Sequence, residues 1–418
     1  MSVVPRARAG SRSRNNVSVP ADLITIAEAR ERVLAAVSPL GHERIPVADA
    51  LDRVLAGAVH AIGDVPPFPA SAMDGYAVRA GAAGRELAVV GESRAGSPSE
   101  HDLQEGEAIR ISTGAAVPSG ATAVIPQENV EARDDRIVTG AAVSEGEHVR
   151  AAGEVMRTGT AVLADGVTLG PAELGAAVAA GAAEVEVALR PRVHVLCTGD
   201  ELREPGAPLG PGEIYNSNGP MLAALAAHCG ALAAAPQLLP DDRTATEAGL
   251  EAALEAAEVV IVSGGVSVGP HDHVKPALTG LGVREVFWGV ALQPGKPTWF
   301  GVRGDRLVFG LPGNPVSAAV TFSLFAAPAL AALQGIAVQP RTGAEAVLGV
   351  PVRRNRRREQ ALRVRLERRD GATVAVPNGP QDSHVIVSLL GADALALIPP
   401  GEGSLEQGAR VALARLPR

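Results

Sequence analysis

The segment from Arg192 to Gly335 restricts the fold more than any other part of the chain, because short apolar strands alternate in it with longer helical patterns. We expect strands at 193–197, 259–262 and 307–310, and helices at 217–230, 245–258 and 315–335. Apolar runs of strand length that alternate with helices are typical of a parallel sheet buried on both faces. The sequence therefore predicts a doubly wound α/β domain, which we place at residues 191–336.

Local signals indicate where several helices begin and end. Thr25 and Glu28 have the spacing of a capping box at the start of an amphipathic helix. Ser217 or Asn218 is expected to cap the helix that ends at Gly230. Further helices are expected at 171–181 and from Pro315, each with proline in the first turn and glycine past the end.

Two other stretches are predicted to be rich in β-structure. Between about residues 66 and 155, short apolar segments such as 87–90 and 122–126 are separated by Gly, Pro and Ser. After Gly335 the alternation returns, and Asp370-Gly371 supplies the residues of a tight hairpin turn. We therefore expect a β-rich insert and a small C-terminal β domain.

Composition excludes several classes of protein. A chain of 418 residues is expected to form two to four domains. The formal charge of −8 argues against a nucleic-acid or membrane-surface binder. No apolar run is expected to approach the roughly 18 residues of a membrane span, and the basic residues 1–20 are expected to form a flexible tail rather than a secretory signal. Two cysteines are too few for a disulfide framework, so we expect a soluble, cytoplasmic protein.

A glycine-rich loop follows the second strand of the α/β segment. The loop SGGVSVG spans residues 263–269 and lies where open α/β sheets bind ligands, at the carboxyl end of a parallel strand. Glycines there let backbone amides approach an anion closely, although a simple tight turn is the alternative. The turn LPGNP, residues 311–315, adds a helix N-terminus at the same rim. The predicted substrate-binding residues are Ser263, Gly264, Gly265, Ser267, Gly269, Pro312, Gly313, Asn314 and Pro315.

Acidic residues are expected to converge on this edge of the sheet. They are Asp200, Glu201, Asp241, Asp242 and Asp272. Carboxylates beside a phosphate-binding loop would repel the ligand unless a cation lay between them, and hard oxygen ligands favour Mg²⁺. Helix capping is the alternative for Asp241 or Asp242. His271 and His273 could be ligands or could face solvent.

Basic residues supply two further candidate sites. Lysine is rare, since only Lys275 and Lys296 occur among 38 Lys and Arg residues, and both lie beside the predicted site. They would add positive charge for a phosphate or another oxyanion. The run RRNRRR at 353–358 could bind an anion or form a solvated sheet edge. Serine hydrolase chemistry is not supported, because no G-x-S-x-G elbow is present.

The motifs taken together, in their order along the chain, resemble one family. They are SAMDGYAV, STGAAVPSGATAVIPQE, TGDEL, IYNSN, SGGVSVG, PGKP and LPGNPVS. This set is similar to MoeA and the E domain of gephyrin over residues 21–418. The resemblance implies a homodimer of four-domain subunits. We assign an elongated linking domain in two segments, 21–60 and 159–190, a β-rich insert at 61–158, and a barrel-like β domain at 337–418.

The resemblance also implies an activity, that of a molybdopterin molybdotransferase. Adenylylated molybdopterin and molybdate would give the molybdenum cofactor and AMP, with Mg²⁺ as the metal. Glu201, Asp242 and Asp272 would hold the metal and the phosphates. Asp74 and Thr113 would lie near the molybdate and the pterin, across the cleft from the α/β domain of the partner subunit. Lys275 and Lys296 complete the predicted catalytic set.

Three positions depart from the family pattern. Gly289 and Gln293 stand where lysines are expected, and Val155 stands where an acidic residue is expected. Two alternatives remain open at this point. One is a molybdopterin adenylyltransferase, which would need only the α/β domain. The other is a carrier or scaffold that binds molybdopterin without turnover. Other proteins of the same biosynthesis are possible partners.

Overall fold

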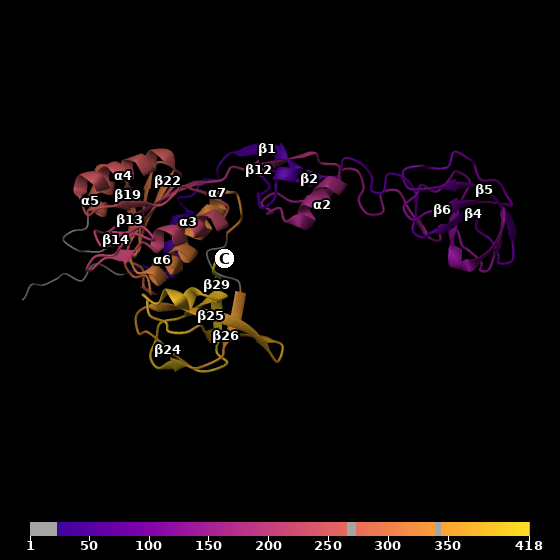
Figure 1. Ribbon diagram of the computed structural model, residues 1–418. Coiled ribbons are helices and arrows are strands. Elements are labelled where there is room, and N and C mark those ends of the chain that lie inside the picture. Colours follow the sequence, from indigo (N-terminus) through magenta and orange to yellow (C-terminus); the bar gives the residue numbers. More distant parts are fainter. Residues whose placement is uncertain (1–22, 266–272, 339–343, 418) are drawn as a thin grey trace, which may run out of the picture.

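The computed structural model describes residues 23–265, 273–338 and 344–417. Figure 1 shows an elongated molecule with three parts: an α/β lobe and a small β lobe lie together at one end, a narrow linking lobe lies in the middle, and a further β lobe lies at the far end. The expected tail at 1–20 lies outside the described residues.

The α/β lobe contains a seven-stranded sheet. Its strands are β13 (Arg192–Thr198), β16 (Leu232–Ala233), β17 (Gln237–Leu239), β18 (Val259–Ser263), β19 (Arg284–Trp288), β21 (Trp299–Arg303) and β22 (Arg306–Leu311). The order is β16-β13-β18-β22-β21-β19, and β17 also pairs with β13. The pairs from β16 to β22 are parallel, as predicted. β21 pairs antiparallel with both β22 and β19. The turn Gly304-Asp305 joins β21 directly to β22, so the expectation of a parallel sheet is wrong for this half.

Helices cover both faces of this sheet. They are α3 (Asn218–His228), α4 (Arg243–Ala256), α5 (Val274–Gly280), α6 (Pro315–Thr321) and α7 (Ala327–Leu333). Successive side chains of a strand point to opposite faces, and β18 shows this division. Val259 and Ile261 belong to the core shared with α3, α6 and α7, whereas Val260 and Val262 belong to the core shared with α4 and α5. The doubly wound prediction is confirmed.

One helix of the α/β lobe is long and strongly apolar. α6 and α7 are joined by a π-helical turn, η3 (Phe322–Ala326), and the whole helix Pro315–Leu333 has 19 residues and a mean hydropathy of 1.9. Ser317, Thr321 and Ser323 interrupt its apolar sequence, so the expectation that no uninterrupted apolar run approaches about 18 residues still holds. In an apolar 18-residue window of this helix, 83% is buried inside the protein. The length and the apolar composition of the helix are therefore explained by its place in the core.

The first helix, α1 (Ile26–Leu34), begins with the predicted capping box. The Oγ1 of Thr25 accepts a hydrogen bond from Glu28 N at 3.1 Å, and Thr25 N donates to Glu28 Oε2 at 2.8 Å. The helix packs its apolar face into the core of the α/β lobe, and Arg30 Nη1 donates to Leu324 O at 3.1 Å. The helix belongs to the segment 21–60 that we assign to the linking domain, yet its apolar stripe is buried on the α/β lobe.

The linking lobe is assembled from two distant segments of the chain. Its elements are β1 (His42–Pro46), η1 (Val47–Asp49), β2 (Val59–His60), β11 (Ala161–Leu163), α2 (Pro171–Ala179) and β12 (Glu184–Ala188). β1 pairs with β12 and β2 pairs with β11, both antiparallel. Leu55 from the first segment and Leu169, Ala177 and Val185 from the second share one core. The two segments therefore depend on each other for burial.

The far lobe is a curled six-stranded sheet with the order β7-β4-β6-β5-β9-β8. Its elements are β3 (Ala70–Ser71), β4 (Gly75–Val78), β5 (Glu86–Ser93), β6 (Glu107–Ile111), β7 (Ala123–Pro126), η2 (Gln127–Asn129), β8 (Val130–Arg133), β9 (Arg136–Thr139) and β10 (Val149–Arg150). Gly75 is required in β4, because a Cβ there would overlap the Ile125 carbonyl on β7. The sheet holds small cores on both faces, so the β-rich character predicted for this stretch is confirmed.

The C-terminal lobe is a closed β-barrel. Its elements are β23 (Ala344–Leu348), β24 (Val352–Arg353), β25 (Glu359–Arg369), β26 (Ala372–Pro377), η4 (Ile386–Leu389), β27 (Ala394–Ile398), β28 (Ser404–Leu405) and β29 (Arg410–Arg415). The ring runs β25-β26-β23-β29-β27 and closes through β25–β27. β20 (Leu292–Gln293), which comes from the α/β lobe, adds to β25. The predicted hairpin is present, with φ of 49° at Asp370 and 78° at Gly371.

Candidate functional site

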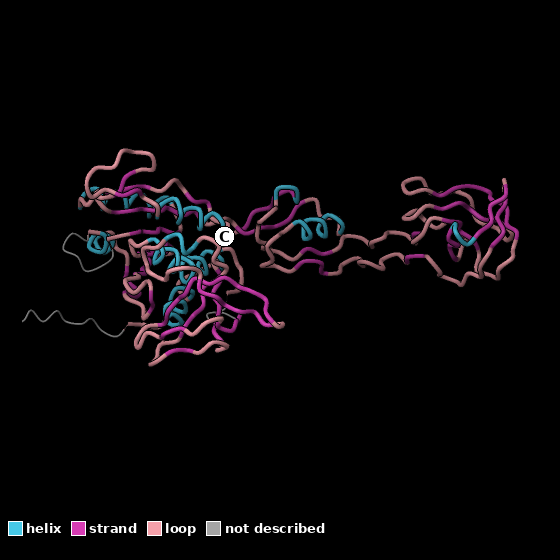
Figure 2. Tube along the Cα trace, turned by 60° about the horizontal axis from the view of Figure 1, so that its bottom comes forward, coloured by secondary structure: helices cyan, strands magenta, loops and turns pink. Residues whose placement is uncertain are grey.

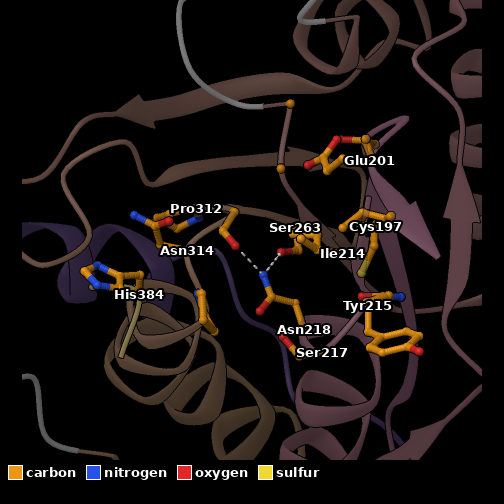
Figure 3. Close-up of a pocket in the computed structure, with 18 of the residues that line it drawn as sticks. Cys197, Glu201, Ile214, Tyr215, Ser217, Asn218, Ser263, Pro312, Asn314 and His384 are labelled. Atoms are coloured by element: carbon orange, nitrogen blue, oxygen red, sulfur yellow. Dashed lines mark hydrogen bonds between the residues drawn. The ribbon is translucent and has the colours of Figure 1, made fainter. Parts of the chain in front are cut away.

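A cavity of about 860 Å³ lies at the carboxyl ends of β13, β18 and β22. Figure 3 shows that its side chains come from several loops and from the start of α3 and α6. The lining residues are Cys197, Thr198, Gly199, Glu201, Leu202, Ile214, Tyr215, Asn216, Ser217, Asn218, Asp241, Ser263, Gly264, Gly265, Pro297, Pro312, Gly313, Asn314, Pro315, His384 and Ile386. This is the edge at which an open α/β sheet is expected to bind a ligand.

The described part of the glycine-rich loop, residues 263–265, lines this cavity. Gly264 and Gly265 have φ values of 93° and 61°, which other residues rarely adopt. A Cβ on Gly264 would lie 2.8 Å from Thr198 O, and one on Gly265 would lie 2.5 Å from Val274 Cγ2. Both glycines are therefore required by backbone conformation and by close packing. Ser267 and Gly269 lie outside the described residues.

Asn218 joins three segments at the floor of the cavity. Its Nδ2 donates to Ser263 Oγ at 2.9 Å and to Gly313 O at 2.6 Å (Figure 3). Because both bonds use the amide nitrogen, Oδ1 is left buried, with no partner among the residues that the structure describes. Asn218 thus fixes the glycine-rich loop relative to the LPGNP turn and keeps one spare acceptor.

The capping of α3 differs from our expectation. Neither Ser217 nor Asn218 provides the capping side chain; instead Asn216 Oδ1 accepts from Gly219 N at 2.9 Å. Asn218 is instead committed to the cavity floor. Both asparagines belong to the IYNSN segment, which was visible in the sequence but was not assigned a role in the site.

The acidic residues divide into different roles. Glu201 and Asp241 line the cavity, and Asp200 and Asp241 accept reciprocally from each other's backbone N–H, at 3.0 and 3.4 Å. Asp242 caps α4, since its Oδ1 accepts from Ala245 N at 2.8 Å, and it is not among the lining residues. Asp272 and His271 lie outside the described residues. The loops therefore converge as the sequence suggested, with Asp241 rather than Asp242 facing the cavity.

The two lysines lie outside the cavity lining. Lys275, on α5, holds its Nζ 4.7 Å from the centre of the Trp288 ring, an attractive cation–π geometry. Lys296 is exposed, and its carbonyl accepts from Val290 N at 3.0 Å. Its neighbour Pro297 reaches the cavity. Lys296 is thus one residue from the lining, whereas Lys275 is engaged on the other side of the sheet.

The C-terminal barrel contributes one wall, which the sequence did not indicate. His384 and Ile386 line the cavity, and Ser383 Oγ accepts from Asn314 Nδ2 at 2.9 Å. This loop is held by Arg363, whose fully buried guanidinium donates to Asp382 O at 3.3 Å and to Ser388 Oγ at 3.2 Å. Burial lowers the pKa of Arg363 to about 10. In the sequence, Arg363 alternates with Leu362 and Val364 as an outward-facing strand residue would, so nothing there signalled its burial.

Cys197 is a buried thiol in the cavity wall. Burial raises its pKa to about 11, although a hydrogen bond with Asn216 opposes the shift. At neutral pH the thiol stays protonated, so it contributes packing rather than a nucleophile.

Asp74 and Thr113 lie together in the far lobe. Asp74 Oδ1 accepts from Thr113 N at 2.7 Å and from Thr113 Oγ1 at 3.0 Å. The two residues border β4 and β6, which Figures 1 and 2 place at the opposite end of the molecule from the cavity. Within one chain they cannot reach the glycine-rich loop.

These two hydrogen bonds hold the pKa of Asp74 below its usual range, the backbone N–H of Thr113 having the larger effect. A lowered carboxyl pKa stabilises the fold above the unfolded pKa of about 3.9, and this contribution is lost as pH falls through the lowered value. We expect Thr113→Val to raise the pKa of Asp74 but to leave it below the unfolded value, because the backbone donor remains. Carboxyl ¹³C NMR titration measures this shift.

A matched control lies in the same protein. Asp64 Oδ1 accepts from Thr158 N at 2.8 Å and from Thr158 Oγ1 at 2.9 Å, and its pKa is lowered for the same reason. Thr158→Val should raise the pKa of Asp64 and leave Asp74 unchanged. An unchanged Asp74 pKa in Thr113→Val would show that the hydroxyl makes no contribution.

Three positions depart from the family pattern, and the structure explains two of them, Gly289 and Gln293. Gly289 has φ of 87°, a conformation that disfavours lysine. Gln293 Oε1 accepts from Asn355 Nδ2 at 2.6 Å and so joins β20 to the barrel. Val155 is 65% exposed and its N–H donates to Val65 O at 2.9 Å. Nothing in the structure explains the valine side chain.

Across 23–265, 273–338 and 344–417, no group of three or more His, Cys, Asp or Glu side chains is placed to hold a metal by protein ligands alone. Magnesium commonly binds through one or two carboxylates together with the phosphates of a substrate. Glu201 and Asp241, which line the cavity beside the glycine-rich loop, fit that manner of binding.

The three regions of the chain match three family models. They match the MoeA N-terminal region (domain I and II) over residues 24–181, a probable molybdopterin binding domain over 194–332, and the MoeA C-terminal region (domain IV) over 345–416. The linking lobe without β12 and the far lobe fall in the first range, most of the α/β lobe in the second, and most of the barrel in the third.

Individual proteins are similar over most of the chain. Molybdopterin molybdenumtransferase 2 of Mycobacterium tuberculosis is 39% identical, covering 85% of this chain and 90% of the relative. Molybdopterin molybdenumtransferase of Haemophilus influenzae is 39% identical, covering 75% and 78%. The crystal structure of the molybdopterin biosynthesis MoeA protein from Pyrococcus horikoshii superimposes with a TM-score of 0.79 at 32% identity, covering 94% of this chain and 99% of that one.

Proposed function

Because the chain belongs to the MoeA family of molybdopterin molybdenumtransferases, we infer that it is a transferase that inserts molybdenum into molybdopterin during synthesis of the molybdenum cofactor. The observation that carries this function is the retained cavity. The glycine-rich loop, Glu201 and Asp241, and the LPGNP turn meet in it. The extra lobes are not needed by a molybdopterin adenylyltransferase, and they favour the insertion reaction.

We further propose that molybdate is the molybdenum donor and that adenylylated molybdopterin is the acceptor, with AMP as the leaving product. The cavity suits such a ligand. A glycine-rich loop at the end of a strand favours phosphates, and the orphaned Oδ1 of Asn218 offers an acceptor to an N–H of a pterin. Magnesium would be held by Glu201 and Asp241, and when bound it would neutralise phosphate charge.

The chain's own residues would position the reactants. Asn218 keeps the two anion-binding turns at a fixed separation through its bonds to Ser263 and Gly313. Lys296, one residue from the lining, would add positive charge where the phosphates separate. Asp272, Ser267 and Gly269 remain predicted members of the site.

Two other properties belong to the same proposal. A homodimer is supported by the distance of Asp74 and Thr113 from the cavity of their own chain (Figures 1 and 2), since a partner subunit could bring its far lobe to that cavity. A cytoplasmic location is supported by the free thiols of Cys197 and Cys229. Other proteins of cofactor synthesis are the proposed partners for product transfer.

The test is an insertion assay. The purified chain is incubated with adenylylated molybdopterin, molybdate and Mg²⁺, and AMP release is followed together with reconstitution of a cofactor-free molybdoenzyme. We expect both signals to require molybdate and to disappear when Mg²⁺ is removed by a chelator. Tight binding of adenylylated molybdopterin with neither signal would identify a carrier instead.

Asp242→Asn separates helix capping from metal binding. Asparagine caps a helix about as well as aspartate does, so we expect thermal stability and insertion activity to stay near wild type if Asp242 only caps α4. Asp241→Asn, at the neighbouring residue that lines the cavity, should lower insertion. The reverse pattern would return Asp242 to the metal site.

A further inference from the structure

A second polar pocket lies in the C-terminal barrel, away from the cavity described above. It has a volume of about 540 Å³ and is lined by residues 353–358, Gly401 and Gly403. Five of these eight lining residues are arginines, and none carries a carboxylate. The chain as a whole has a formal charge of −8, so this local excess of positive charge is opposite in sign to the net charge.

Carboxylates of the protein neutralise little of the positive charge of these arginines. Arg356 Nε lies 3.8 Å from Glu402 Oε1, and both side chains are more than 80% exposed, so this pair contributes little. For Arg353, Arg354, Arg357 and Arg358, no carboxylate among the described residues lies within 4.0 Å of a guanidinium nitrogen. Like charges held this close repel one another, and a bound anion would relieve that repulsion.

Hydrogen bonds hold the backbone of the pocket in place before any ligand binds. Asn355 Oδ1 accepts from Arg357 N at 2.9 Å and from Arg358 N at 3.0 Å. Gly401 N donates to Asn355 O at 2.9 Å, and Arg354 N donates to Gly403 O at 3.0 Å. These bonds hold the two loops that form the pocket, so less conformational entropy is lost when the side chains close on a ligand.

Arg354 has a different position from the other arginines. Its guanidinium donates to Glu402 O and lies against Gly401, where a Cβ would overlap it. It therefore braces the opposite loop. Arg357 is exposed and Arg358 is half-buried, so these two arginines are available to a ligand.

We propose that the 353–358 pocket binds a tetrahedral oxyanion of the phosphate or molybdate class. Guanidinium groups present forked donors that match the paired oxygens of such anions. The pocket is also joined to the segment that carries Lys296, because Asn355 Nδ2 donates to Gln293 Oε1 at 2.6 Å. This site is separate from the insertion cavity and extends the function proposed above.

The experiment measures binding of sodium phosphate and of sodium molybdate to the full chain by isothermal titration calorimetry. We expect Arg357→Ala/Arg358→Ala to bind one anion fewer per chain than wild type, or to bind it at least about tenfold more weakly. Arg357→Lys/Arg358→Lys, which keeps the charge but loses the fork, should give an intermediate affinity. Wild-type binding should weaken as salt is raised.

Arg368→Ala/Arg369→Ala is the matched control, because it removes two exposed arginines from the β25–β26 hairpin outside the pocket. An equal loss in this control would show a net-charge effect and overturn the site, as would identical anion binding by wild type and Arg357→Ala/Arg358→Ala. Binding of both anions indicates shared oxyanion chemistry, and preference for one identifies its source. Molybdopterin is absent from the assay, so the result does not depend on the insertion reaction.

Discussion

Glu201→Gln will lower kcat/KM for molybdenum insertion by on the order of 10²–10³-fold, the range typical when one preorganised charge interaction is removed from an active site. Glu201 lines the cavity beside the glycine-rich loop, and in the proposed reaction its carboxylate would share a cation with substrate phosphates. Glutamine has nearly the same size but no charge. The fold should be unaffected, because the loop is held by the backbone of Glu201, whose carbonyl accepts from Ile214 N at 2.8 Å.

The measurement is steady-state AMP release with varied Mg²⁺. If Glu201 acts through the metal, part of the lost activity should return at high Mg²⁺. Glu204→Gln is the matched control, since it removes the same charge from an exposed position of the same loop outside the cavity lining. Equal losses in both variants, or full activity in Glu201→Gln, would remove Glu201 from the site.

The second large effect concerns the composition of the active site. Asp74→Asn and Glu201→Gln should each be nearly inactive alone, whereas hybrid dimers formed from both chains should recover activity. In a symmetric dimer with random pairing, half of the dimers are hybrids and each contains one intact site, so about a quarter of wild-type activity is expected. The physical reason is the extended shape of the chain, which keeps its own far lobe away from its own cavity (Figure 1).

A second mixture of variants is the control for the recovery of activity. A mixture of Glu201→Gln with Asp241→Asn should show no recovery, because both changes lie in the cavity and every hybrid site then carries one of them. Absence of recovery for Asp74→Asn with Glu201→Gln, in a sample where hybrid dimers are demonstrated, would place both residues in the same chain's site or show that Asp74 has no role there.

The sequence alone determined the features that depend on neighbouring residues. The capping box of α1 and the hairpin turn at Asp370-Gly371 were predicted and are present. The strand β18 and its glycine-rich loop were also predicted, because an apolar run followed by glycines has a local physical meaning. The order of the motifs was enough to indicate the family.

Tertiary structure decided everything that depends on pairing between distant segments. The apolar stripe of α1 fits any apolar surface, and only packing shows that it is buried on the α/β lobe. Asp241 and Asp242 are adjacent, yet the start of α4 turns one toward the cavity and uses the other as a cap. The wall formed by His384 and Arg363 comes from the barrel, and barrel closure through β25–β27 is a long-range contact that local propensity cannot specify.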